Sequence, residues 1–169
     1  MNHPSKFTPV IISSFVMLFI SLFPVINLLN VLCCAGIVIG GASGTWYYAR
    51  QLEKAGDFIQ NKDGIMIGLL AGIISAFIYV IFSTTIIMLS GQNPVEMIYK
   101  MTDIYGIALP PETQQILNSV HGEYQRNGFS VVMIGVELTS RIITHCIFGP
   151  IGGLLVASIF NKRRNASTK

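Results

Sequence analysis

Four apolar stretches in this chain are long enough to cross a lipid bilayer, and three of them carry small residues at every fourth position. A helix needs about 20 mostly apolar residues to span the hydrocarbon core of a membrane. Charged residues make up 11% of the chain, against about 25% in an ordinary soluble domain. The sequence therefore predicts an all-α, polytopic membrane protein, with four transmembrane helices bundled in a single membrane domain over residues 1–169. The small net charge of +3 does not indicate nucleic-acid binding.

The polar breaks between the apolar stretches set the bounds of the spans. Residues 9–48 contain no charged side chain, and one helix of that length would be about 60 Å long, about twice the hydrocarbon thickness. We place the turn near Pro24, which removes a backbone donor. The basic run 162–164 ends the last span, and counting back about 20 residues gives its start. The predicted spans are residues 8–23, 27–48, 64–89 and 141–160.

The segment between the third and fourth spans is predicted to be helical and to lie outside the hydrocarbon. Asn93 and Pro94 are a typical N-cap and first helical residue, and they begin a predicted helix over 94–105. A second helix is predicted over 112–125. Both have one apolar face, so they lie on the bilayer surface or cover the bundle. At the start of the third span, Asp63 is the predicted N-cap.

Basic residues predict the orientation of the chain. With four spans, the N-terminus, the 49–63 loop and the C-terminal tail lie on the same side of the membrane. That side holds Lys6, Arg50, Lys54, Lys62, Lys162, Arg163, Arg164 and Lys169. The 90–128 loop holds only Lys100 and Arg126 as cations. Since cytoplasmic loops carry an excess of Lys and Arg, we expect a multi-pass protein of the cytoplasmic (inner) membrane with both termini in the cytoplasm.

Three spans carry glycines at positions where they form a flat ridge along one face of the helix. Residues four apart lie nearly above one another, and without side chains they let two backbones approach closely. We expect these ridges to pack helices within one chain, and the alternative is that one ridge joins two copies of the chain. The ridge residues are Gly36, Gly40 and Gly44 in the second span, Gly64, Gly68 and Gly72 in the third, and Gly149 and Gly153 in the fourth.

One polar stripe interrupts the fourth span. Glu137, Arg141 and His145 are spaced i, i+4, i+8, which stacks them on one helix face and suits a Glu137–Arg141 ion pair. Ionisable groups within a span are costly and mark candidate functional sites. Three interpretations stay open: an interfacial anchor, a proton- or substrate-binding site, and contact with lipid headgroups. As an anchor, His145 would bond a hydroxyl of another helix, such as Ser13, Ser14, Ser83, Thr84 or Thr85.

The sequence contains no pattern typical of an enzyme. No phosphate-binding glycine loop, nucleophile elbow or zinc-protease motif is present, so we predict no catalytic residue, no metal and no cofactor. Cys33, Cys34 and Cys146 lie in apolar stretches and are expected to pack as small buried side chains, although a Cys34–Cys146 bridge stays open. The first function hypothesis is a non-enzymatic scaffold or accessory subunit. The alternative is a small transporter or channel that acts as an oligomer.

The second span ends in aromatic residues beside a cation. Trp46, Tyr47 and Tyr48 precede Arg50, as in the aromatic belt at a membrane interface. Together with Cys33-Cys34-Ala35-Gly36 and Gly40-Gly41, this pattern resembles that of small four-span bacterial membrane proteins to which no activity is assigned. The resemblance implies a four-helix membrane fold and no site residues. The expected partners are the lipid bilayer and either a second copy of the chain or another membrane protein.

Overall fold

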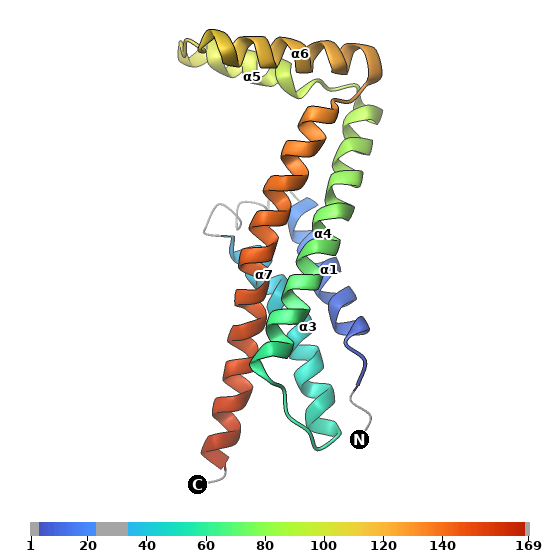
Figure 1. The fold of residues 1–169 in the computed structure, drawn as a ribbon, viewed down its shortest axis with the longest axis vertical. Coiled ribbons are helices and arrows are strands. Elements are labelled where there is room, and N and C mark those ends of the chain that lie inside the picture. The colour runs from blue at the N-terminus through green and yellow to red at the C-terminus, as the bar shows by residue number, and fades with distance from the viewer. Residues whose placement is uncertain (1–3, 23–33, 168–169) are drawn as a thin grey trace. The chain divides into compact units, whose positions relative to one another are not determined.

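The computed structural model of the protein describes residues 4–22 and 34–167, and its secondary structure there is entirely helical (Figure 1). The all-α prediction is therefore confirmed. In chain order the helices are α1 (Phe7–Leu22), α3 (Ala35–Lys54), α4 (Asn61–Ser90), α5 (Pro94–Tyr105), α6 (Pro111–Asn127) and α7 (Val131–Ser167). The predicted turn near Pro24, the start of the second span at residue 27 and Cys33 lie outside the described residues.

The chain divides into two compact units. Unit 1 comprises Met1–Tyr79 and Ser140–Lys169, and unit 2 comprises Val80–Thr139. Unit 1 therefore holds α1, α3, the first part of α4 and the last part of α7. Unit 2 holds α5 and α6 with the remaining parts of α4 and α7. A single membrane domain over the whole chain stays a prediction.

In residues 4–22 and 34–167, two helices are long and apolar enough to cross a membrane. They are α4 and the Val131–Arg164 part of α7, with mean hydropathies of 2.6 and 1.9. Helix α1 is apolar but has only 16 residues. Helix α3 has 20 residues but is not apolar enough. The structure thus supports membrane association through two helices, and the four-span arrangement is taken up below as a proposal.

Helix α4 begins earlier than predicted, and the assignment of Asp63 as its N-cap is wrong. The helix starts at Asn61, so Asp63 lies in its first turn. The backbone N–H of Gln60 donates to Oδ2 of Asp63 at 3.0 Å, so the side chain reaches back across the helix start. Oδ1 also pairs with Nζ of Lys6 at 2.7 Å. Asp63 therefore joins the beginning of α1 to the beginning of α4.

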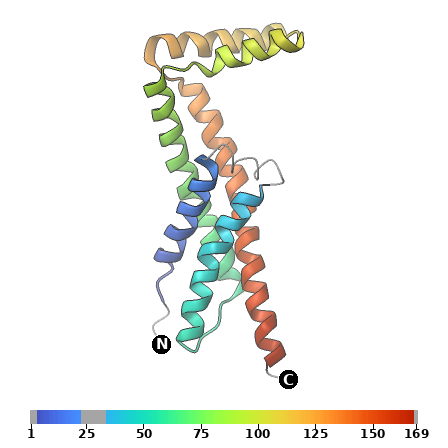
Figure 2. The same ribbon diagram turned by 180° about the vertical axis from the view of Figure 1, so that it is seen from behind.

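The same end of unit 1 receives the end of α7. Nδ2 of Asn161 donates to Oδ1 of Asn61 at 3.1 Å. The guanidinium of Arg164 lies 4.5 Å from the centre of the Phe58 ring in the α3–α4 connection. Figures 1 and 2 show the start of α1 and the end of α7 at this end of the unit. The beginnings of α1 and α4, the end of α7 and the α3–α4 connection therefore contact one another at this end of unit 1.

In unit 2, α5 and α6 lie side by side (Figures 1 and 2). Helix α5 coincides with the predicted helix over 94–105, and Oδ1 of Asn93 accepts a hydrogen bond from the Val95 N–H at 3.0 Å, as expected of an N-cap. The hydroxyl of Tyr99 donates to Oδ1 of Asn118 at 2.8 Å across the pair. Val95 and Val120 are buried, so each helix turns an apolar residue inward.

Small residues bring the backbones of unit 1 into direct contact. A methyl group added at Gly149 would lie 2.6 Å from the carbonyl oxygen of Gly68, and one added at Gly41 or Gly68 would overlap the carbonyl of Gly149. Gly64 and Gly153 face each other in the same way. Helices α3, α4 and α7 therefore meet at glycine faces, where only the absence of side chains permits the observed spacing.

Helix α1 packs on α3 through the other predicted ridge. Gly40 lies against the side chain and backbone of Met17, and Gly44 lies against the carbonyl of Pro9. Met17 is fully buried, and its methyl group also approaches Gly149 of α7. A side chain from α1 therefore fills the centre of unit 1. The surrounding core consists of Val10, Ile37, Tyr48, Ala49, Leu52, Ile59, Ile67, Ala71 and Ala157.

We expect Gly149→Ala to lower stability by about 1–3 kcal/mol, since the added methyl overpacks a contact between two backbones. Gly135→Ala on the same helix is the matched control, because nothing lies within 4 Å of its added methyl. Its better helix propensity should raise stability by up to about 1 kcal/mol. Thermal unfolding in mild detergent measures both. Equal shifts for the two variants would contradict the close contact at Gly149.

Candidate functional site

The predicted polar stripe on α7 is divided between the two units. Glu137 belongs to unit 2, whereas Arg141 and His145 belong to unit 1. Among the described residues, Glu137 and Arg141 each have a partner on α4. The expected Glu137–Arg141 ion pair stays a prediction, and the two residues are described with the partners that the structure gives them.

Glu137 is half-buried and accepts hydrogen bonds from one hydroxyl. Oγ of Ser83 lies 3.3 Å from Oε1 and 3.4 Å from Oε2 of the carboxylate. Burial raises the pKa of Tyr124 on α6, and the negative charge of Glu137 raises it further. The carboxylate is thus held by α4 and acts electrostatically on a phenol in the connecting helices of the same unit.

The guanidinium of Arg141 stacks on an aromatic ring, so its charge is not left without a partner. Its guanidinium carbon lies 3.8 Å from the centre of the Tyr79 ring on α4. A cation over the face of an aromatic ring is stabilised by the negative potential of that face. The sequence reasoning missed Tyr79, although an aromatic residue with a polar end in an apolar span is a signal for such a role.

His145 is the most buried member of the stripe, with 1% of its surface exposed. Nδ1 lies 2.8 Å from the carbonyl oxygen of Arg141, one turn earlier in the same helix. Because a carbonyl only accepts, we assign the proton of the neutral ring to Nδ1, which leaves a lone pair on Nε2. Nε2 is buried and has no hydrogen-bond partner among the described residues.

No hydroxyl in the described part of the chain bonds His145, so the expected hydroxyl partner is wrong there. Ser13 donates to the carbonyl of Gly40 at 2.7 Å, and Ser14 donates to that of Val10 at 2.8 Å. Ser83 bonds Glu137, and Thr85 donates to the carbonyl of Ile81 at 2.7 Å. Ser14 and Thr85 thus bond a carbonyl four residues earlier in their own helix, a local choice that competes with contacts between helices. Ser13 and Ser83 bond other helices, but not at His145.

Ser21 on α1 is a second buried polar group without a hydrogen-bond partner in the described part of the chain. It lies one turn beyond Met17, whose methyl group approaches Gly149 of α7. Unit 1 therefore holds a buried hydroxyl on α1 and a buried imidazole nitrogen on α7, both without a hydrogen-bond partner among the described residues. The i, i+7 spacing of Ser14 and Ser21 was an available signal for this polar face.

Seven glycines of the predicted ridges lie at helix contacts, and two others join them; the place of Gly36 in its ridge stays a prediction. The seven are Gly40, Gly44, Gly64, Gly68, Gly72, Gly149 and Gly153. Gly41 meets Gly149, and Gly152 lies against the carbonyl of Val38. Neither belonged to a predicted ridge, although each is the neighbour of a ridge glycine. A pair of adjacent glycines leaves two faces of a helix bare, which allows one helix to pack closely against two others. Gly72 lies against the backbone of His145.

The described residues offer no arrangement for a metal ion. No group of three His, Cys, Asp or Glu side chains in residues 4–22 and 34–167 has the required proximity. Cys34 and Cys146 are free thiols and half-buried, so the disulfide left open by the sequence is not formed.

Comparison with known proteins identifies no relative. No protein-family model matches the chain, and no curated protein or solved structure matches it.

Substitution of His145 by Ala should lower the stability of the protein in detergent by about 2 kcal/mol, because it removes a fully buried ring and leaves a cavity. Ile143→Ala is the matched control, since Ile143 lies on the same helix and is 56% exposed. Its loss should change stability by less than about 0.5 kcal/mol. Thermal unfolding compares the two, and an unchanged melting temperature for His145→Ala would argue against the buried position.

Proposed function

We propose that this protein crosses the cytoplasmic (inner) membrane four times, with both termini in the cytoplasm, and serves there as a non-enzymatic scaffold or accessory subunit. The burial pattern of unit 1 supports lipid as the solvent of the helices, and its glycine contacts support the scaffold role. The distribution of basic residues along the sequence supports the orientation.

The distribution of side chains in unit 1 favours lipid as the solvent. Ser13, Thr45 and Ser75 are fully buried, whereas Phe15 is 66% exposed and Leu155 is 53% exposed. In water this arrangement would be unfavourable, because the large apolar side chains face the solvent while polar side chains are buried. In hydrocarbon the large side chains are solvated, and the buried hydroxyls bond backbone carbonyls.

The packing of unit 1 supports four crossings. Helices α1 and α3 contact each other, and α3 contacts α7 at Gly41. If α7 crosses the bilayer, these helices share its depth. Helix α3 has 15 residues from Ala35 to Ala49, before its first charged side chain, which corresponds to about 22 Å against a hydrocarbon core of about 30 Å. The 16 residues of α1 give about 24 Å, which local thinning of the bilayer accommodates.

The single observation that carries the proposed role is the contact between backbones at the centre of unit 1. Gly41, Gly68 and Gly149 leave no space for even a methyl group between α3, α4 and α7. A conduction path needs room for at least water between helices. The contact between α3, α4 and α7 leaves no such room. A partner can therefore bind only to the apolar surface on the outside of unit 1. A scaffold or accessory subunit acts through such a surface.

Purification in mild detergent followed by mass measurement tests the role. We expect a stable complex, with either a second copy of the chain or another membrane protein, that persists when the detergent is exchanged for one with a different headgroup. A protein that remains a monomer without a partner in both detergents would contradict the proposal. Solubility without detergent would contradict membrane insertion itself.

Thiol labelling in intact cells tests the orientation. In a background without native cysteines, we expect Gln125→Cys in the 90–128 loop to react with a membrane-impermeant maleimide from outside. Glu53→Cys, after the second span, should react only when the membrane is permeabilised. Both residues are exposed, so access to solvent does not distinguish them. Labelling of both positions from outside, or of Glu53→Cys alone, would contradict the orientation.

The second candidate function is a small transporter or channel that acts as an oligomer. It is favoured by Ser21 Oγ and His145 Nε2, two buried polar atoms without partners in the described residues. Such atoms offer a hydrogen-bond donor and a proton acceptor within a span. The purified protein in proteoliposomes would then carry solute flux, and Glu137→Gln or Arg141→Ala would change it. Flux by a protein that shows no partner would favour this function over the scaffold.

A further inference from the structure

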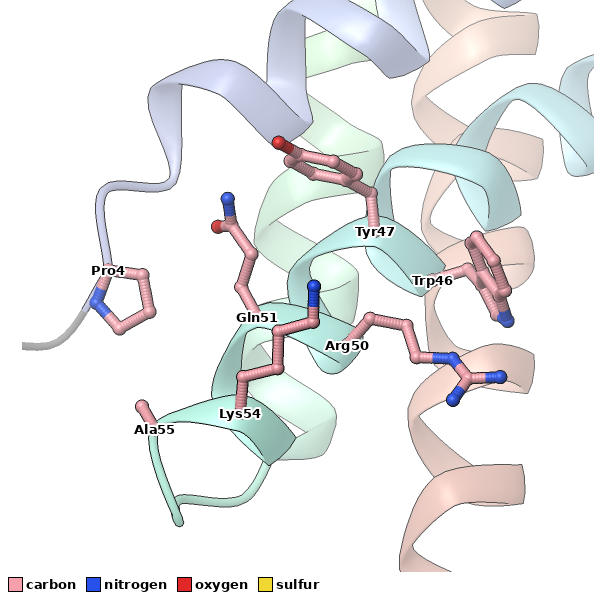
Figure 3. Close-up of a pocket in the computed structure, with 7 residues that line it drawn as sticks. All are labelled: Pro4, Trp46, Tyr47, Arg50, Gln51, Lys54 and Ala55. Atoms are coloured by element: carbon pink, nitrogen blue, oxygen red, sulfur yellow. The ribbon is translucent and has the colours of Figure 1, made fainter.

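A cleft opens on unit 1 beside the last turns of α3 (Figure 3). Its volume is about 830 Å³. The lining residues come from α3, its C-terminal end and the segment before α1, and they are Pro4, Trp46, Tyr47, Arg50, Gln51, Lys54 and Ala55. Two cations, one phenol and one amide therefore border a single hollow, and a ring of proline and an indole close its sides.

The charge in this cleft is positive. The Arg50 guanidinium lies 5.2 Å from the centre of the Trp46 ring and 3.6 Å from the carboxylate of Glu53. That ion pair is about half exposed on both sides, so solvent screens it and it neutralises Arg50 only in part. No ion pair joins Lys54 to a carboxylate within the described residues. None of the described residues that line the cleft is acidic.

The cleft borders an apolar surface as well as the polar end of the helix. Trp46 is 50% exposed, and Ile39, seven residues earlier on the same face of α3, is 51% exposed. Figure 3 shows the Lys54 and Gln51 side chains projecting on the side of the cleft toward Tyr47, with the Trp46 indole beside Arg50. A ligand with an anionic head and an apolar tail thus finds cations at the helix end, the Trp46 indole one to two turns away and the Ile39 side chain about three to four turns away.

We infer that this cleft binds the phosphate headgroup of an anionic phospholipid from the cytoplasmic leaflet. Lys54 and Arg50 supply the charge, Gln51 and Tyr47 supply hydrogen bonds to phosphate or glycerol oxygens, and the acyl chains lie along Trp46 and Ile39. The inference rests on the proposed membrane insertion, which places the 49–63 segment at the cytoplasmic surface. Anionic lipids are attracted to basic groups at that surface. A free phosphate shares the head chemistry but gains nothing from the apolar border.

The chain contains one tryptophan, and it lines the cleft, which provides a built-in probe. The full-length protein is reconstituted in vesicles of unlabelled zwitterionic lipid that contain a minor fraction of lipid with brominated chains. Bromine quenches the Trp46 fluorescence at short range. Brominated anionic phospholipid should quench several-fold more strongly than brominated zwitterionic phospholipid at the same mole fraction.

Lys54→Gln should lower this preference for anionic lipid about fivefold, the effect expected of one basic residue near the surface. The Lys54 side chain points away from the indole, and the cation at the indole is Arg50 (Figure 3), so the substitution leaves the surroundings of the probe unchanged. Lys162→Gln is the matched control, since it removes a cation from the same proposed side of the membrane but does not line the cleft. Lys54→Arg should retain the preference. Equal melting temperatures in detergent show that the variants are folded.

The outcomes separate the cleft from the membrane insertion. Strong and equal quenching by both brominated lipids would overturn the headgroup site while leaving the insertion intact. An equal loss of preference in Lys54→Gln and Lys162→Gln would also overturn it, because a diffuse surface charge then explains the effect. Loss of the preference in millimolar inorganic phosphate, but not in chloride of equal ionic strength, would show that free phosphate competes on equal terms and would overturn the contribution of the apolar border. No quenching by either lipid would overturn the proposed insertion.

Discussion

The approach of helix backbones at Gly149 is the contact on which unit 1 depends. The carbonyl of this residue lies against Gly41 of α3 and Gly68 of α4, and the side chain of Met17 reaches it from α1. In hydrocarbon, burial of apolar side chains does not drive helices together, because lipid tails solvate them equally well. Dispersion contacts between closely spaced backbones take over that role. A side chain at this position would separate all of these helices at once.

Close packing of backbones also decides where the polar groups go. With no room for water between the helices, each buried hydroxyl needs a carbonyl within reach. Ser13 and Thr45 meet this requirement through the carbonyls of Gly40 and Gly41, which have no side chain in the way. Oγ of Ser21 and Nε2 of His145 have no hydrogen-bond partner among the described residues. They are therefore the polar groups whose presence packing alone does not explain.

The two ends of α3 lie in different surroundings, and their side chains differ accordingly. Toward its start, Ile37 and Gly41 face the interior, and their requirements are those of packing. Toward its end, Arg50 and Lys54 project at the surface beside Trp46, where charge and amphipathic rings suit a polar boundary. One helix thus links the packed centre of unit 1 to the cleft at its polar end.

Helix content, the position of α5 and the faces of the glycine ridges were open to prediction because each depends on local spacing and on single residues such as Asn93 and Pro94. The sequence by itself also determined that the chain is helical. In long apolar segments with few charges, a helix pairs every backbone N–H and C=O group within the segment. Only the tertiary structure decided the partners on other helices, which are Ser83 for Glu137 and Tyr79 for Arg141. The physical reason is that a periodic pattern specifies which face of a helix a residue occupies. The neighbour of that face depends on the rotation and depth at which whole helices pack.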